Sequence, residues 1–219
     1  MNSLILSIDL DEWFHCRWAT GSKNVRWQNP KDVFRDYFLS NKPAGEIIKP
    51  TKWLLMVLKK RNIRATFFIL GEVALWYPDL IKEIAEAGHE IASHGMHHQD
   101  LTLLSKSDFS KELKESCQIL QKISGTNIVG FRAPNLVITS WLNKVLIEQN
   151  FLYDSSVCSG RNIQGKYRGQ SGVRANPYRT SRWSLLEKGN SNLWEIPIPT
   201  FPGLKLPAAV SIATRIFGL

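Results

Sequence analysis

Apolar positions follow two alternating patterns along this chain. Short continuous apolar runs are typical of buried strands, whereas segments with apolar residues every three or four positions are typical of helices packed on a sheet. The runs predict strands at residues 4–8, 64–71, 89–93, 128–131, 151–153 and 193–197. The periodic segments predict helices that begin near Pro50, cover about 79–87, run from Ser105 or Ser107 to Gly125, and cover about 140–149. This alternation indicates an α/β domain with a parallel sheet, either closed into a barrel or open and doubly wound.

Two stretches show neither pattern. Residues 13–45 are rich in aromatic side chains, and we expect a long functional loop whose rings either stack on sugars or form the loop's own core. Residues 155–186 contain no acidic residue and are rich in glycine. We expect this second stretch to be a solvated basic loop that faces an anionic saccharide. Its basic residues are Arg161, Lys166, Arg168, Arg174, Arg179 and Arg182.

The composition fits one globular domain that covers residues 1–219. A hydrophobic content of 43% and an aromatic content of 11% can supply a packed core. The net charge is +9, but no nucleic-acid-binding module accompanies it, so we expect no nucleic-acid partner. Three cysteines without CxxC spacing indicate reduced thiols rather than a disulfide framework. We see neither a secretion leader nor an apolar run long enough for a membrane span, so a cytoplasmic location is the default.

Polar side chains recur where the predicted strands end. Asp9, Asp11 and Glu12 follow the first strand, Arg132 follows the fourth, and Asp154 follows the fifth. Because unpaired buried acids are costly, the three carboxylates either form a site or mark a polar exit from the strand. If the strand continues, Asp9 and Asp11 point to the same face. The carboxyl-terminal ends of parallel strands form the face on which barrel enzymes build their sites.

Three of the chain's five histidines lie within residues 94–98, directly after the third predicted strand. His94 and His98 are spaced so that a helical turn would bring both imidazoles to one side. Imidazole binds zinc and its first-row neighbours well at neutral pH. The segment therefore predicts a metal site, with a solvated histidine-rich turn as the alternative.

Five stretches, taken together and in order, point to a known family. They are SIDLD at 7–11, ATFFILG at 65–71, GHEIASHGMHH at 88–98, GFRAP at 130–134 and YDSS at 153–156. The chain resembles the polysaccharide deacetylases, the NodB-homology group of carbohydrate esterase family four. The resemblance implies a distorted (β/α)7 barrel. It also implies a hydrolase of non-peptide carbon–nitrogen bonds that removes N-acetyl groups from an N-acetylated polysaccharide or oligosaccharide.

The resemblance further implies one divalent metal ion, most often zinc, held by an aspartate and two histidines. By motif, Asp11 is the metal carboxylate, and His94 and His98 are the metal imidazoles. The two aspartates of the common first motif are adjacent, whereas one residue separates them here, so Glu12 is a rival to Asp11. His97 occupies the variable position before the second imidazole, and we expect it to be a neighbour rather than a ligand.

Four more residues have roles that the resemblance implies. Asp9 corresponds to the general base, and Arg132 corresponds to the arginine that pairs with it. A cation at that place would lower the pKa of the base and keep it ionised. Asp154 corresponds to the aspartate that tunes the family's catalytic histidine. Asn135 stands where many members have tyrosine, and its main-chain N–H is the candidate donor to the oxyanion.

The chain departs from the family pattern in one respect. The family's catalytic acid is a histidine in a late motif, and no histidine follows His98 before the chain ends at Leu219. We interpret the chain as an incomplete barrel that lacks the last strand and helix together with this histidine. Two alternatives to a deacetylase therefore stay open. One is a non-catalytic saccharide-binding protein, and the other is a small-amide amidohydrolase on the same scaffold.

Overall fold

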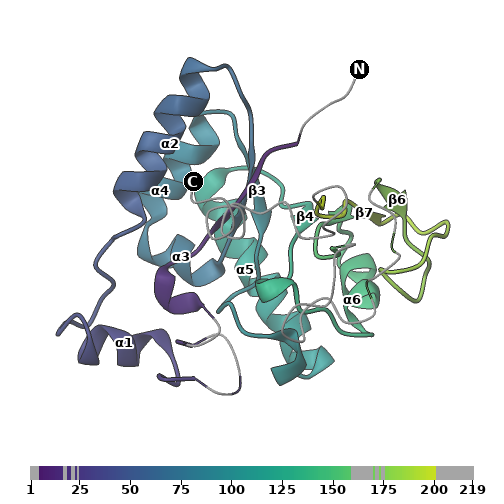
Figure 1. Ribbon diagram of the computed structural model, residues 1–219, viewed down its shortest axis with the longest axis horizontal. Coiled ribbons are helices and arrows are strands. Elements are labelled where there is room, and N and C mark those ends of the chain that lie inside the picture. Colours follow the sequence, from purple (N-terminus) through teal and green to yellow (C-terminus); the bar gives the residue numbers. More distant parts are fainter. Residues whose placement is uncertain are drawn as a thin grey trace. The chain divides into compact units, whose positions relative to one another are not determined.

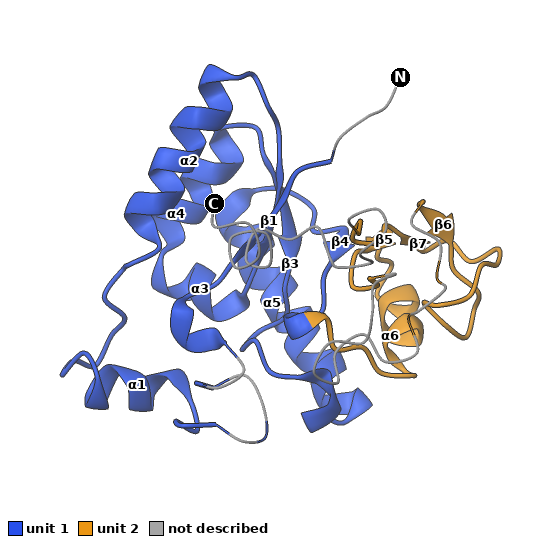
Figure 2. Ribbon diagram, viewed as in Figure 1, with its two compact units in different colours: residues 1–135 blue, residues 136–219 orange. Residues whose placement is uncertain are grey.

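The structure is a computed structural model. It describes residues 5–16, 19–20, 23, 25–158, 170, 173 and 176–200. The chain forms two compact units, Met1–Asn135 and Leu136–Leu219, shown in blue and orange in Figure 2. Each unit is described by itself below. The expectation of one domain over residues 1–219 stays a prediction.

The first unit alternates strands with helices. Its strands are β1 (Ser7–Leu10), β2 (Thr66–Ile69), β3 (Glu90–Ser93) and β4 (Gly130–Phe131). Its α-helices are α1 (Pro30–Asp36), α2 (Ile48–Lys60), α3 (Gly71–Trp76), α4 (Pro78–Glu86) and α5 (Lys106–Ser124). The 3-10 helices are η1 (Trp13–His15), η2 (Leu101–Leu103) and η3 (Pro134–Leu136), the last of which lies at the boundary between the units. The predicted α/β class with a mostly parallel sheet is confirmed.

The four strands of the first unit lie side by side in chain order and are all parallel. Asp9 of β1 pairs with Phe68 of β2, and Ile69 of β2 pairs with Ser93 of β3. Ser93 in turn pairs with Phe131 of β4. This register places the carboxyl-terminal ends of β1, β3 and β4 at one edge of the sheet. The polar residues that follow those strands are therefore close neighbours.

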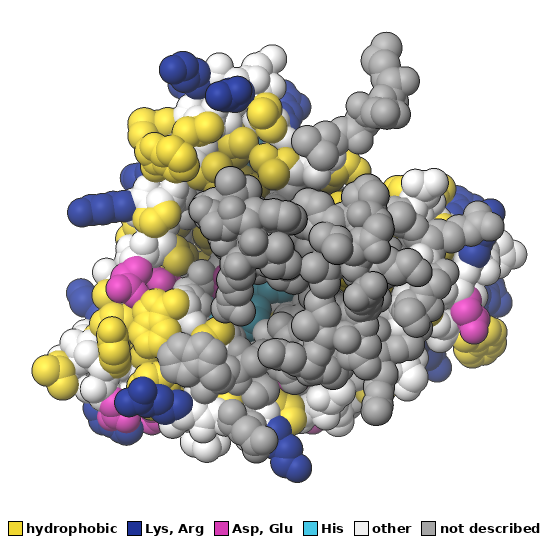
Figure 3. Space-filling model, in the orientation of Figure 1, with side chains coloured by type: hydrophobic (Ala, Val, Ile, Leu, Met, Phe, Trp, Pro, Cys, Tyr) yellow, Lys and Arg dark blue, Asp and Glu magenta, His cyan; other side chains and the backbone are white. Residues whose placement is uncertain are grey.

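Helices α2 and α4 lie side by side in Figure 1 and pack against the strands. Leu58 of α2 is 3% exposed, and Ile81 and Ile84 of α4 are fully buried together with Phe67 of β2. Burying each such side chain stabilises the fold by about 1.5–3 kcal/mol. Figure 3 shows further apolar side chains (yellow) exposed on the side of the molecule where α2 lies.

Helix α5 begins after Ser105, one of the two starts that the sequence offers, and ends at Gly125 as predicted. The Ser105 hydroxyl oxygen caps it by accepting the N–H of Asp108 at 3.1 Å. Gly125 ends it in the left-handed conformation, with φ 69°, which glycine adopts without the steric cost of a Cβ. No helix in the described part of the chain is long and apolar enough to cross a lipid bilayer.

The aromatic stretch at 13–45 is more ordered than its pattern predicted. It contains η1 and α1, and the seven residues of α1 are too few to show a helical period. Phe14 and Phe34 are 0% and 2% exposed and form a separate core with Trp27. These rings are therefore the segment's own core. Tyr37 is 60% exposed, and the stacking of such rings on sugars stays a prediction.

The second unit contains α6 (Leu142–Glu148), β5 (Tyr153–Asp154), β6 (Tyr178–Arg179) and β7 (Trp194–Glu195). Strand β7 is parallel to β5 and antiparallel to β6. The prediction that all of 155–186 is loop is therefore wrong at β6, which is too short to show an alternating pattern. Arg179 stacks 5.7 Å from the Trp194 ring centroid. Arg161, Lys166, Arg168 and Arg174 of the predicted basic loop lie outside the described residues.

Candidate active site and metal-binding residues

Asp9 and Arg132 form a charged pair at the edge of the sheet. Arg132 directly follows β4, and its Nη1 lies 2.6 Å from Oδ1 of Asp9 in β1. Its Nη2 donates to Ser7 Oγ at 3.0 Å, and its guanidinium carbon lies 4.0 Å from the centroid of the Phe68 ring. These contacts fix the plane of the guanidinium group and thereby orient the Asp9 carboxylate.

The surroundings of Asp9 favour its ionised form. Desolvation tends to raise the pKa of Asp9, whereas the positive charge of Arg132 and the hydrogen bond that it donates lower it. Because 37% of the side-chain surface stays exposed, desolvation is incomplete, and the pKa lies below its ordinary value. A carboxylate that is ionised at neutral pH can accept a proton. This is the chemistry required of a general base, and the role of Asp9 stays a prediction.

His94 and His98 come together without the helical turn that their spacing predicted. The chain bends after β3, with Gly95 at φ 87° and His98 at φ 54°, and the two ring centroids lie 4.9 Å apart. The carbonyls of Gly95 and Met96 accept the N–H groups of Gly71 and Glu72 at 2.9 and 3.2 Å. The backbone of the bend therefore pairs with the start of α3 instead of forming helical hydrogen bonds with itself.

Main-chain carbonyls hold both imidazole rings through Nδ1. His94 Nδ1 lies 2.8 Å from the Arg132 carbonyl oxygen, and His98 Nδ1 lies 2.8 Å from the His15 carbonyl oxygen. A carbonyl oxygen can only accept, so each Nδ1 carries the hydrogen, and each neutral ring leaves a lone pair on Nε2. Burial lowers the pKa of both histidines and keeps them neutral. Neutral imidazole is the form that binds metal ions.

Asp11 faces the free nitrogen of His98. Its Oδ2 lies 3.2 Å from His98 Nε2. When Asp11 is ionised and His98 is neutral, neither atom carries a hydrogen, so a proton or a cation has to lie between them. Desolvation, with a smaller contribution from the nearby Asp9 charge, raises the pKa of Asp11 to about 7. Two ligand atoms that are each about 2.0–2.1 Å from a tetrahedral zinc ion would be about 3.3 Å apart.

The donor chemistry of these residues fits a divalent metal ion. The Asp11–His98 pair has the spacing of two ligands, and the His94 ring lies beside it. Among the residues that the structure describes, however, no group of three or more histidine, cysteine, aspartate or glutamate side chains is arranged to hold a metal ion. The structure places Asp11 beside His98 and His98 beside His94, and the metal-binding role of the three residues stays a prediction.

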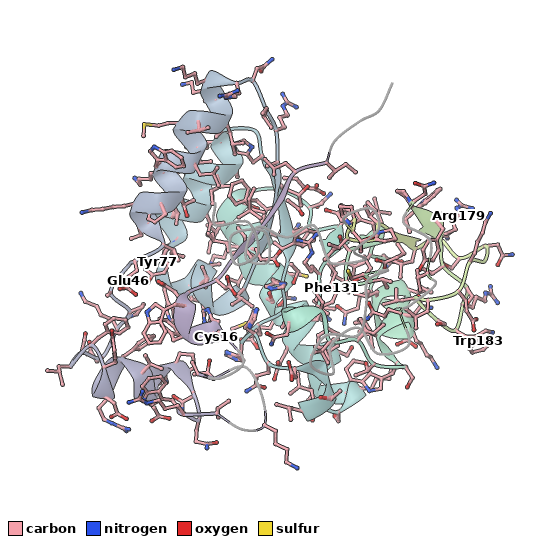
Figure 4. All side chains as sticks on the ribbon, viewed as in Figure 1. Cys16, Glu46, Tyr77, Phe131, Arg179 and Trp183 are labelled. Atoms are coloured by element: carbon pink, nitrogen blue, oxygen red, sulfur yellow. The ribbon has the colours of Figure 1, made fainter. Side chains whose placement is uncertain are left out.

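Glu12, the rival to Asp11, turns toward Tyr77. The Tyr77 hydroxyl donates to Glu12 Oε1 at 2.7 Å, and the Glu12 side chain also caps η1. The same hydroxyl accepts the Gly45 N–H at 3.2 Å, and Figure 4 shows Tyr77 beside Glu46. Glu12 therefore ties η1 to the segment around Gly45. The geometry favours Asp11 as the carboxylate that faces the histidines.

The other two predicted residues lie in different units. Asn135 has φ 56°, a conformation that asparagine tolerates better than most residues, and its Nδ2 donates to Asp100 Oδ1 at 3.0 Å. Asp154 belongs to the second unit and is fully buried. It accepts hydrogen bonds from the Ser156 N–H at 2.9 Å and from the Ser156 hydroxyl at 2.7 Å. The catalytic roles of Asn135 and Asp154 stay predictions.

Sequence analysis did not single out Ser7 or Glu72, although both support the site. Ser7 accepts a hydrogen bond from Arg132, and a single hydroxyl within a strand gives no signal of such a role. Glu72 is 6% exposed and lies between His15 and His97. The one available signal was an acidic residue directly after a strongly apolar run.

Comparison with known proteins finds a family that part of this chain resembles. A family model described as polysaccharide deacetylase matches residues 49–152. This part of the chain is similar to the polysaccharide deacetylases. Strand β1 precedes the matched segment. It carries Asp9 at the same edge of the sheet at which β3 and β4 end.

Two curated relatives show how far the similarity extends. A peptidoglycan-N-acetylglucosamine deacetylase of Bacillus cereus is 32% identical over 108 residues, which cover 49% of this chain and 39% of that protein. A peptidoglycan deacetylase of Helicobacter pylori is 29% identical over 129 residues, which cover 59% of this chain and 42% of that protein. The matched part therefore spans less than half the length of these two curated relatives.

One solved structure resembles this chain over almost its whole length. A crystal structure of a candidate polysaccharide deacetylase from Mycobacterium smegmatis superposes with a TM-score of 0.66 at 24% sequence identity. The superposition covers 98% of this chain and 69% of the other. It supports the polysaccharide deacetylase fold.

Proposed function

We propose that this chain is a metal-dependent hydrolase that removes N-acetyl groups from an N-acetylated polysaccharide or oligosaccharide. The observation that carries the proposal is the meeting of Asp9–Arg132 and Asp11–His98–His94 at one edge of the sheet. The similarity to the polysaccharide deacetylase family and to two peptidoglycan deacetylases supports an acetylated glycan as the substrate.

In this proposal Asp11, His94 and His98 hold one divalent metal ion, for which zinc suits two imidazoles and a carboxylate. Such an ion, when bound, polarises an amide carbonyl and lowers the pKa of water. His94 and His98 present Nε2 because main-chain carbonyls occupy their Nδ1 hydrogens. Asp11 contributes a negative charge that offsets part of the charge of the cation.

Asp9 then takes the proton from the attacking water. Arg132 keeps Asp9 ionised and fixes the direction of its oxygens through the contact of 2.6 Å. The main-chain N–H of Asn135 is the proposed donor to the oxyanion that develops on the amide oxygen. The leaving amine requires a proton, and we assign that step to no residue of this chain.

Metal content and acetate release test the proposal. We expect the purified chain to bind one divalent ion, and we expect His94→Ala and His98→Ala to lose it. Asp9→Asn should keep the metal but lose acetate release, because a carboxamide does not accept the proton. A matched control is His89→Gln, since His89 lies at the opposite ends of the strands, where its Nδ1 accepts the Ala65 N–H at 3.2 Å.

The substrate is tested with N-acetylglucosamine oligomers beside small amides. Acetate release from the oligomers alone supports the proposal. Hydrolysis of small amides alone would point instead to an amidohydrolase. Binding of metal and oligomer without acetate release would identify a saccharide-binding protein. Unchanged metal content in both histidine variants would contradict the assignment of the ligands.

A further inference from the structure

Glu72 is a buried carboxylate that bridges two histidines outside the proposed ligand set. It lies in the first turn of α3 and is 6% exposed. Its Oε1 lies 3.1 Å from His15 Nε2, and its Oε2 lies 3.0 Å from His97 Nδ1. Burial tends to raise the pKa of Glu72, but the hydrogen bonds and charges of His15 and His97 outweigh it and lower the pKa. Glu72 is therefore an anion held between two rings.

The first contact of Glu72 leads to His98 through His15. The His15 ring is fully buried and stacks on Trp76, with ring centroids 5.8 Å apart and planes 5° apart. Its Nδ1 accepts the Glu12 N–H at 2.9 Å, so in the neutral ring Nε2 carries the hydrogen, and this nitrogen lies 3.1 Å from Glu72 Oε1. The His15 carbonyl oxygen is the atom that holds His98 Nδ1. Fixing His15 thus fixes the acceptor that orients His98.

The second contact of Glu72 reaches the neighbour of His98 in the chain. His97 is anchored through Nδ1 at 3.0 Å, and the next residue, His98, has φ 54°. A left-handed conformation is unfavourable for a residue with a side chain and persists only where its surroundings hold it. The N–H of Glu72 also donates to the Met96 carbonyl at 3.2 Å. Side chain and backbone of Glu72 together hold the bend that carries His98.

We propose that Glu72 is a positioning residue for His98. Through its contact with His15, Glu72 fixes the His15 carbonyl oxygen, which accepts the hydrogen on His98 Nδ1. Through its contact with His97, Glu72 holds the backbone of the bend. His98 Nε2 is thereby kept free and aimed at Asp11. The inference rests on the proposed function in that His98 is offered there as a metal ligand. Groups that orient metal-binding histidines typically change metal affinity about 10- to 100-fold when they are mutated.

His94 provides an internal control for this proposal. The carbonyl of Arg132, which directly follows β4, holds its Nδ1, whereas the Glu72 carboxylate contacts His15 and His97. Removing the Glu72 carboxylate should therefore disturb His98 and leave His94 unchanged. General loosening of the fold would disturb both rings.

The test compares Glu72→Leu and Glu72→Gln with the parent chain and with Glu86→Gln. Leucine removes both acceptors, whereas glutamine keeps one acceptor and a similar shape. Glu86 is an exposed residue that pairs weakly with Lys82 at 3.8 Å, so its variant controls for loss of a carboxylate. Nitrogen-15 spectra of the metal-free chains report which ring nitrogen carries hydrogen. Competition with a chelator gives the Kd for zinc.

We expect His98 in Glu72→Leu to change from the Nδ1–H form to a mixture of the two neutral forms, while His94 keeps its Nδ1–H form. The Kd for zinc should rise about 10- to 100-fold in Glu72→Leu, rise less in Glu72→Gln, and stay unchanged in Glu86→Gln. A folded Glu72→Leu chain with lowered stability but with parental His98 spectra and zinc Kd would overturn the proposal.

Two outcomes separate this proposal from the proposed function. If Glu72→Leu does not fold, Glu72→Gln and His97→Ala carry the test, and parental His98 spectra in both would overturn the proposal. If the parent chain binds no zinc, the metal site of the proposed function fails. The spectra of the metal-free chains then still decide whether Glu72 positions His98.

Discussion

The pair formed by Asp9 and Arg132 should stabilise the fold measurably as well as orient the carboxylate. The perturbation is a double-mutant cycle with Asp9→Asn, Arg132→Met and the two changes combined. The Arg132 side chain is 8% exposed and the Asp9 side chain is 37% exposed, at a distance of 2.6 Å. Removing one partner of a fully buried pair costs about 3–5 kcal/mol, whereas an exposed pair is worth about 0.2–1 kcal/mol. The Asp9–Arg132 pair is partly buried, so its contribution should lie between these two energies.

We therefore expect Arg132→Met to lower the free energy of unfolding by about 2–3 kcal/mol, because it also removes the hydrogen bond to Ser7 and the contact with Phe68. The coupling energy between the two substitutions should be about 1–2 kcal/mol. Urea unfolding followed by tryptophan fluorescence and by circular dichroism gives the free energy of each variant.

An exposed pair of similar length supplies the control. Lys52 and Glu83 join α2 to α4 at 2.9 Å, with side chains 53% and 45% exposed. The cycle Lys52→Met with Glu83→Gln should give a coupling of about 0.5 kcal/mol or less. A coupling for Asp9 and Arg132 no larger than that of the control pair would refute the argument from burial.

Three further predictions concern single positions. Gly71→Ala should destabilise the chain by about 1–3 kcal/mol, because its Cβ would meet Met96 Sδ and lie 3.1 Å from Ser116 Cα; an unchanged urea midpoint would contradict this. Ser105→Ala should lower the free energy of unfolding by about 1 kcal/mol, because it removes the N-terminal cap of α5. The loss is measured as a lower melting temperature, and a decrease below about 0.3 kcal/mol would argue against the cap. Burial raises the pKa of Cys117 to about 11, so its alkylation, followed by mass spectrometry of its peptide, should be slow at neutral pH and accelerate about tenfold per pH unit up to that value. A rate that levels off near pH 9 would show an ordinary thiol.

A feature could be predicted from the sequence where all the residues that determine it lie in one short segment. Helix α5 carries its cap at Ser105, its apolar face, and its stop at Gly125 within the same segment, so its two ends could be predicted. The histidines at 94–98 and the carboxylates after β1 were also recognisable, since each set follows an apolar run. A parallel sheet then implies that these strand ends meet at one edge.

Other features depend on contacts between distant parts of the chain. The bend that joins His94 and His98 exists because its carbonyls pair with the start of α3, so the helical turn inferred from spacing does not form. Asp11 rather than Glu12 faces His98 because Tyr77, far along the sequence, engages Glu12. Glu72 acquires its place only when α3, η1 and the bend meet. The sequence by itself determined which groups could do chemistry, and packing decided which of them point at one another, because hydrogen-bond partners are chosen among neighbours that only the folded chain creates.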